Sequence, residues 1–105
     1  MDGSGGYVPE VWRLVRGDGL IGEITITDRD FPWLYGDFEA QAGFGEFKPL
    51  FDRELELLSA DDGHEEWESV YEKVTGPLAL VSPDGPVSHF LLHIDGAEAW
   101  FRWAD

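Results

Sequence analysis

The chain has 105 residues, no cysteine and a formal net charge of -15 from 22 acidic and 7 basic side chains. This length predicts a single domain over residues 1–105, with the glycine-rich residues 1–7 as a flexible tail. The lack of cysteine excludes disulfides, zinc–thiolate sites and cysteine nucleophiles. The charge disfavours contact with nucleic acid and with anionic membranes. Because the chain shows neither a signal-peptide pattern nor an apolar run of about 18 residues, we expect a cytoplasmic protein.

A β-hairpin is predicted first, around the turn at residues 17–19, Gly-Asp-Gly. Its strands are VWRLV (11–15) and LIGEITIT (20–27). The favoured register sets Trp12 opposite Ile24 and Val15 opposite Ile21, because it gathers apolar side chains on one face and opposite charges on the other. A third strand follows over residues 30–39, with Pro32 at its start or on an edge.

Two helices are predicted next. The first starts between Gly45 and Pro49 and carries an apolar stripe in which Glu54 is embedded. This stripe consists of Phe47, Leu50, Phe51, Leu55 and Leu58. After an interruption at residues 61–63, a second helix presents Trp67, Val70, Tyr71 and Val74, and it stops at Gly76-Pro77.

The remaining chain returns to strand, with a turn at residues 82–85 and a second one at Asp95-Gly96. These strands span residues 78–81, 87–94 and 97–103. A two-residue loop at Asp95-Gly96 pairs Leu91 with Trp100 and His93 with Glu98. One face then holds Phe90, Leu92, Ile94, Phe101 and Trp103. Strands, then two helices, then strands predict an α+β fold: an antiparallel sheet of about five or six strands, in the order ββ(β)-αα-βββ, with a two-helix hairpin packed on one face.

The opposite face of this sheet, which we call the outer face, is predicted to be rich in aromatic side chains. Its candidate interaction residues are Trp33, Tyr35, Leu91, His93, Trp100 and Arg102. Monomers seldom expose large apolar patches, and tryptophan and tyrosine beside arginine are typical of interfaces. The alternative is that loops, the tail or sheet curvature bury these side chains.

The helices also carry an acidic surface, with Asp52, Glu56, Glu65, Glu66, Glu68 and Glu72 as its candidate residues. Such a surface can steer a basic partner in a salt-sensitive way. The alternative is the ordinary solvated side of amphipathic helices.

The chain shows no catalytic, metal or nucleotide motif, and we expect no cofactor. His93 beside Glu98, or a buried Glu54, could act as a general acid or base. A simple cross-strand pair on a wet face explains the first arrangement equally well.

Two tryptophan-rich stretches, WLYGDFE (33–39) and LLHIDGAEAWFRW (91–103), resemble small acidic uncharacterised proteins of actinobacteria. That resemblance implies no activity and assigns no site residues.

We therefore expect a non-enzymatic protein-interaction module, which uses the outer face for a basic protein partner or for a homodimer. The alternative is a small-ligand-binding protein or small enzyme with a pocket near Trp33, Tyr35, His93 and Trp100. Capture of a basic partner should weaken as salt is added.

Overall fold

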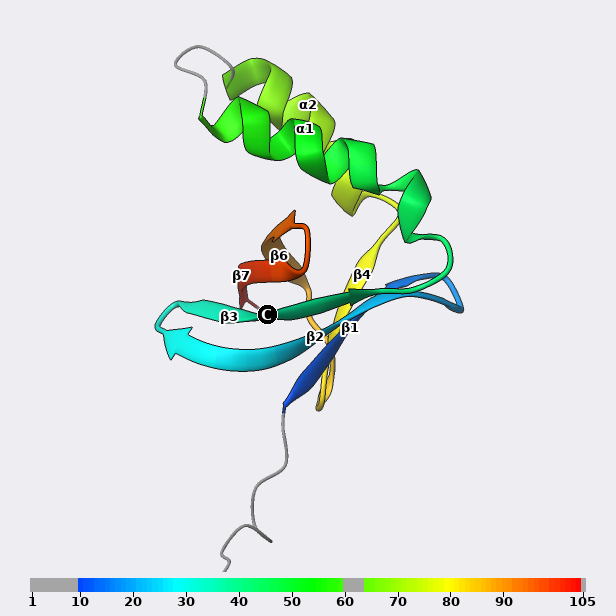
Figure 1. Cartoon of the computed structure of the whole chain (residues 1–105), viewed down its shortest axis with the longest axis vertical. Coiled ribbons are helices and arrows are strands. Elements are labelled where there is room, and N and C mark those ends of the chain that lie inside the picture. Colours follow the sequence, from blue (N-terminus) through cyan, green and yellow to red (C-terminus); the bar gives the residue numbers. More distant parts are fainter. Residues whose placement is uncertain (1–9, 60–63, 105) are drawn as a thin grey trace, which may run out of the picture.

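A computed structural model describes residues 10–59 and 64–104, which form an α+β fold (Figure 1). The strands are β1 (Val11–Arg16), β2 (Gly19–Asp30), β3 (Trp33–Ala40), β4 (Ala79–Ser82), β5 (Gly85–Pro86), β6 (His89–Asp95) and β7 (Glu98–Ala104). The helices are a short 3-10 turn, η1 (Phe44–Glu46), followed by α1 (Lys48–Leu58) and α2 (His64–Thr75). The predicted tail at residues 1–7 and the interruption at residues 61–63 lie outside the described residues.

All seven strands belong to one curled antiparallel sheet with the order β5-β4-β1-β2-β3-β7-β6. The expected fold class is confirmed, but the expected count of five or six strands is wrong. The additional strand is β5, which arises because the turn at residues 82–85 is tight enough to pair Val81 with Pro86 and Ser82 with Gly85. In the sequence this segment is indistinguishable from a loop.

The first hairpin has the predicted register along most of its length. Trp12 lies opposite Ile24, as expected from the apolar alternation. A bulge after Leu14 then places Val15 opposite Leu20, so the predicted pairing of Val15 with Ile21 is wrong. A bulge accommodates one extra residue in one strand near the turn. The residues beyond the bulge therefore point to the predicted faces.

The last hairpin turns one residue later than predicted. Its turn residues are Gly96 and Ala97, with Gly96 at a φ of 62°, where glycine is the favoured residue. As a result Trp100 lies opposite His93 instead of Leu91. The shift between strands is two residues, and therefore every side chain keeps its predicted face although its neighbour changes.

Gly36 of β3 lies where the backbones of β2 and β3 approach each other closely. A Cβ built at Gly36 would lie 2.4 Å from the carbonyl oxygen of Thr25 on the paired strand, and 2.8 Å from a side-chain carbon of Ile24. The β2 register also shifts beside this point, between Ile26 and Asp28. A side chain at position 36 would therefore clash with the backbone of the paired strand.

The core fills the concave side of the curl and is continued by aromatic residues of the helical segment. Its buried members are Trp12, Leu14, Ile21, Ile24, Ile26, Phe38, Phe44, Phe47, Phe51, Val74, Leu78, Leu80, Leu92, Ile94, Ala99 and Phe101. Phe44 links the two layers, with its ring centroid 4.8 Å from that of Phe38 and 5.9 Å from that of Phe51.

The buried side of α1 differs slightly from the predicted stripe. Phe51, Glu54 and Leu57 are buried, whereas Leu58 is 50% exposed. The stripe thus rotates toward Leu57 near the end of the helix, where α1 faces α2 and not the sheet. In α2, Val70 and Val74 are buried as expected.

The helical hairpin lies against the end strand β6, which it covers along one edge of the sheet (Figure 1). Phe51 of α1 and Val74 of α2 belong to the same buried core as the inner residues of the strands, so the hairpin packs on that face as well as along the edge. The opposite end of the curl, where β1 begins and β7 ends, lies away from the helices.

Candidate functional site

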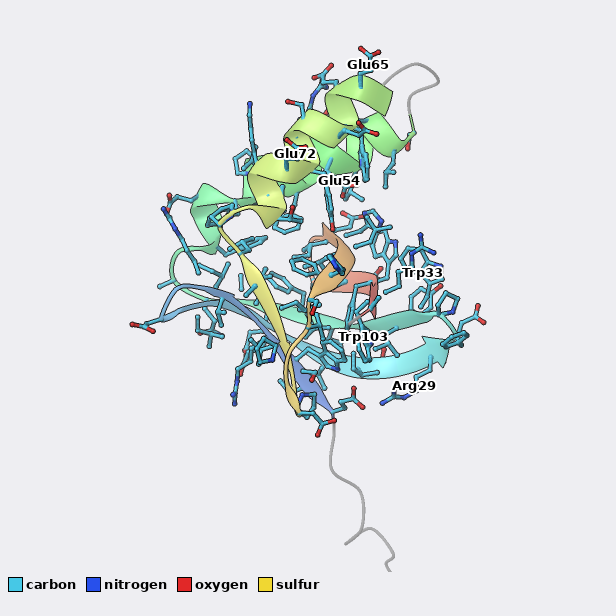
Figure 2. The ribbon with its side chains drawn as sticks, turned by 180° about the vertical axis from the view of Figure 1, so that it is seen from behind. Arg29, Trp33, Glu54, Glu65, Glu72 and Trp103 are labelled. Atoms are coloured by element: carbon cyan, nitrogen blue, oxygen red, sulfur yellow. The ribbon has the colours of Figure 1, made fainter. Side chains whose placement is uncertain are left out.

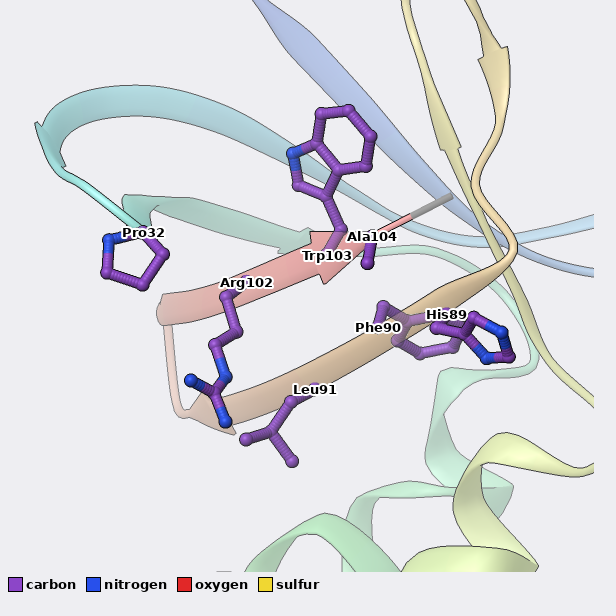
Figure 3. A pocket seen from close by; sticks show the side chains of 7 residues that line it. All are labelled: Pro32, His89, Phe90, Leu91, Arg102, Trp103 and Ala104. Atoms are coloured by element: carbon purple, nitrogen blue, oxygen red, sulfur yellow. The ribbon is translucent and has the colours of Figure 1, made fainter.

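The six outer-face residues lie on the same side of β3, β7 and β6, as strand alternation predicts. Tyr35 pairs with Trp100, and Trp100 pairs with His93. The His93 ring centroid is 5.5 Å from that of Trp100 and 6.0 Å from that of Trp33. The Arg102 guanidinium lies 5.5 Å above the Trp33 ring. Leu91 sits opposite Arg102, and both project from one side of the β6–β7 hairpin while Trp103 projects from the other (Figure 3).

This face is only partly open to solvent. His93 is 3% exposed, Arg102 is exposed, and the other four residues are half-buried. The reason is Glu54 on α1, which reaches over the edge of β6 and contacts His93. The expectation that the helices shelter only the inner face is therefore wrong at this position.

Glu54 and His93 form a buried pair between the helices and the sheet. The distance from Glu54 Oε1 to His93 Nδ1 is 2.9 Å, and Trp67 Nε1 donates a hydrogen bond of 2.6 Å to Glu54 Oε2. The predicted partner Glu98 instead pairs with Asp95 across the hairpin. The sequence signal for the correct pair was a carboxylate inside an apolar helical stripe. Neither Glu54 nor His93 lines any of the cavities described below.

A second contact between the layers is made by Tyr71 of α2. Its hydroxyl donates a hydrogen bond of 3.1 Å to the carbonyl oxygen of Phe90, and the backbone N–H of Leu92 donates one of 2.7 Å to the hydroxyl. Burial raises the pKa of the Tyr71 phenol well above its ordinary value, although the bond from Leu92 acts in the opposite direction. The phenol therefore keeps its proton and remains a donor at neutral pH.

The acidic residues of the helices divide into two groups. Lys48 bridges Asp52 at 2.7 Å, and Arg53 bridges both Glu66 at 2.5 Å and Glu56 at 3.3 Å. The second group runs along α2 with spacings of three and four residues and consists of Glu65, Glu68 and Glu72, all exposed. We call this group the α2 acidic stripe. Figure 2 shows Glu65 and Glu72 on the helical hairpin, with Arg29 at the far end of the sheet.

An aromatic concavity lies at the open end of the curl, on the side away from the helices. It has a volume of about 460 Å³ and is lined by Glu10, Trp12, Arg29, Phe31, Pro32, Trp33, Leu34 and Trp103. We call this set of residues the aromatic mouth. A second hollow of about 300 Å³ lies toward the β4–β5 turn and shares Glu10, Trp12 and Trp103 with the mouth. A third hollow of about 430 Å³ adjoins Trp103 along β6 and β7 (Figure 3).

Two side chains of the mouth are unusually exposed. Phe31, in the turn between β2 and β3, is 97% exposed, and Trp103 is 44% exposed. Trp103 extends the core outward, since its ring centroid lies 5.7 Å from that of the buried Trp12. Sequence reasoning placed Trp103 on the correct face, but could not show that this end of the face is uncovered. Phe31 was missed, and its only signal was an aromatic residue before the turn proline.

A polar network holds one wall of the mouth together. Trp12 Nε1 donates a hydrogen bond of 2.5 Å to Glu10, and Arg29 forms an ion pair with the same carboxylate. Partial burial acts to raise the pKa of Glu10, but the bonds from Trp12 and Arg29 and the charge of Arg29 outweigh it, so the pKa lies below the ordinary value of 4.5. Glu10 is thus ionised at neutral pH.

The described part of the chain contains no cluster of three histidine or acidic side chains that could hold a metal ion. Within residues 10–59 and 64–104, no helix has the length and apolarity to cross a membrane. The chain matches no protein-family model, no curated protein and no solved structure.

Proposed function

We propose that this chain is a non-enzymatic protein-interaction module that docks a basic partner protein on the aromatic mouth. The observation that carries the proposal is the exposure of Phe31, 97%, beside a cavity whose wall includes the half-exposed Trp103. Covering one such aromatic side chain contributes about 1.5–3 kcal/mol, and aromatic residues with arginine nearby are typical of interface centres. Glu54 and His93, the two buried groups that could act as acid or base, line none of the four cavities described here and take no part in this proposal.

The outer face plays a smaller part in this proposal than the sequence suggested. His93 is held beneath Glu54 and offers almost no surface. Trp33 belongs to both regions, because it carries Arg102 on the outer face and also lines the mouth. Docking at the mouth therefore uses the edge of the outer face at Trp33.

The charge of the chain supports a basic partner. The formal net charge is -15, and Asp84 lines the hollow that adjoins the mouth. A field of this sign accelerates encounter with cations and repels polyanions. Self-association through Phe31 and Trp103 would bring like charges together, which makes a homodimer the less favoured form of the same proposal.

Selection from a displayed library of random peptides tests the proposal directly. Wild-type protein and two variants, Phe31→Ser and Trp103→Ala, serve as baits, and Leu58→Ser is the matched control. Leu58 is 50% exposed but lies at the end of α1, far from the mouth in the chain and in the fold. We expect basic peptides that bind wild type and Leu58→Ser equally, and that lose about tenfold or more in affinity for the two mouth variants.

Peptides that bind all four proteins equally would show that the mouth is not the docking surface. Light scattering over a range of concentrations separates the homodimer, since only self-association makes the wild-type mass depend on concentration and the Phe31→Ser mass independent of it.

A small-molecule ligand is the second candidate, because a concavity of about 460 Å³ falls within the usual range for ligand sites of about 300–1,000 Å³. A thermal-shift screen against wild type and Trp103→Ala tests it. Compounds that raise the melting temperature of wild type alone would favour this candidate. If no compound raises the melting temperature of wild type more than that of Trp103→Ala, the small-ligand candidate is rejected.

A further inference from the structure

Both edge strands of the sheet are partly blocked against an added strand in the part of the chain that the structure describes. On β6, the Tyr71 hydroxyl binds the carbonyl of Phe90 and the N–H of Leu92, which are the groups that a new strand would need. On the other side, β5 has two residues, one of which is Pro86, and the carbonyl of Leu80 is bound by Val87. These contacts disfavour strand addition, and they favour a peptide partner that binds through side-chain surfaces.

The mouth offers two adjoining hollows separated by indoles. One is the cavity of about 460 Å³ beside Phe31 and Pro32, and the other is the hollow of about 300 Å³ beside the β4–β5 turn. Trp12 and Trp103 form walls of both. Flat aromatic walls on either side of a ridge suit proline rings, which a polyproline II helix presents at about three residues per turn with little loss of conformational entropy.

Charge at the rim adds a second requirement. Glu10 lines both hollows, and Asp84 lines the second. Arg29 also lines the first hollow, but its charge is already paired with Glu10. The rim therefore favours a ligand that carries cations beside its apolar segment.

We propose that the aromatic mouth binds a proline-rich segment in the polyproline II conformation, flanked by arginine or lysine. This inference rests on the proposed function and narrows it to one class of partner. The prolines pack against Trp103, Trp33 and Phe31, while the flanking cations lie near Asp84 and in the field of the acidic chain.

Three synthetic peptides test this assignment on the full chain. The first has a Pro-Pro-Leu-Pro-Pro core between arginines, the second replaces every proline by alanine at the same charge, and the third keeps the prolines but has glutamates in place of the arginines. Affinity is measured by titration, and the indole N–H signals of the five tryptophans report the position of the ligand by NMR. We expect the first peptide to shift the Trp103 signal and to bind about tenfold or more tightly than the other two.

Two substitutions locate the binding. Phe31→Ser should weaken the first peptide about tenfold or more, and because Phe31 is 97% exposed this variant retains its fold. Asp84→Asn should weaken it less and should reduce the salt dependence. Equal binding of the proline and alanine peptides would overturn the proline assignment while leaving a basic-peptide site at the mouth. No binding of the first peptide, with library peptides still selected by the mouth, would also overturn this inference and leave the proposed function intact.

Discussion

The hydroxyl group of Tyr71 occupies the place that a neighbouring strand would take along β6. It accepts the N–H of Leu92 and donates to the carbonyl of Phe90, so that two backbone groups at the sheet edge are satisfied by one side chain. Buried backbone groups without a partner are costly. One phenol thus both attaches the helices to the sheet and protects its edge.

Removal of this hydroxyl should destabilise the protein measurably. Tyr71→Phe leaves both backbone groups unpaired, and we expect a loss of about 1–3 kcal/mol in the free energy of unfolding, measured by urea denaturation. Amide exchange at Leu92 should accelerate. The control is Tyr35→Phe, whose hydroxyl makes no hydrogen bond within the described residues and whose removal should change stability by less than about 0.5 kcal/mol. Equal effects of the two substitutions would contradict the edge role.

The ionisation of Glu10 makes the stability of the aromatic mouth depend on pH. Its pKa is lower in the folded chain than its ordinary value of 4.5, so folding favours the ionised form. The stability that Glu10 contributes is therefore complete above that value, and it is lost as the pH falls through the lowered pKa of the folded state. The ion pair with Arg29 and the bond from Trp12 weaken with it.

The lowered pKa of Glu10 predicts a difference between two pH profiles. Wild type should lose stability between pH 5 and the acid limit by a larger amount than Glu10→Gln, when melting temperatures are compared across about pH 2–7. At neutral pH the variant should be the less stable of the two. Parallel profiles with a constant offset would show that Glu10 does not titrate in the folded chain as its contacts require.

At the scale of elements, the buried pair of Glu54 and His93 fixes α1 against β6. Both groups are shielded from water, and Trp67 of α2 binds the second carboxylate oxygen, so three elements meet at one carboxylate. Loss of one partner from a buried pair leaves the other without compensation, whereas replacement of both by apolar groups can be nearly neutral.

A double-mutant cycle should show strong coupling across this contact. Glu54→Leu and His93→Phe should each cost about 3–5 kcal/mol in the free energy of unfolding, and the double variant should cost clearly less than their sum. The matched control is Arg53→Gln, which breaks the exposed contact with Glu66 between the same two helices and should cost at most about 1 kcal/mol. Strict additivity in the cycle would show that the pair is incidental to packing.

Sequence patterns specified faces better than they specified neighbours. Alternation placed Trp100 and His93 on the correct side although the predicted register differed by two residues, because such a shift preserves the face. The contact of His93 with Glu54 could not be predicted, since it depends on which edge of the sheet the helices cover. For the same reason the sequence did not predict the exposure of Trp103, because exposure at the end of a curled sheet depends on whether another segment covers it.

At the scale of the whole molecule, charge and docking surface are separated in space. The α2 acidic stripe lies on the helical hairpin, and the mouth lies at the other end of the sheet (Figure 2). Long-range charge changes association rates, whereas groups in contact change dissociation rates. The stripe should therefore steer a basic partner without touching it.

Neutralisation of the stripe tests this separation. The arginine-flanked proline peptide is the probe. The variant Glu65→Gln/Glu68→Gln/Glu72→Gln should bind it more slowly than wild type at low salt and release it at the wild-type rate. The difference in association rate should largely disappear at about 1 M salt, where the Debye length is about 3 Å. Phe31→Ser should show the reverse, with faster dissociation and little change in association. A third variant, Asp18→Asn/Glu39→Gln/Glu98→Gln, removes the same charge from exposed positions on the strands and the β1–β2 turn. Equal slowing by the two triple variants would mean that net charge alone steers the partner, and faster dissociation from the helix variant would mean that the helices themselves form part of the docking surface.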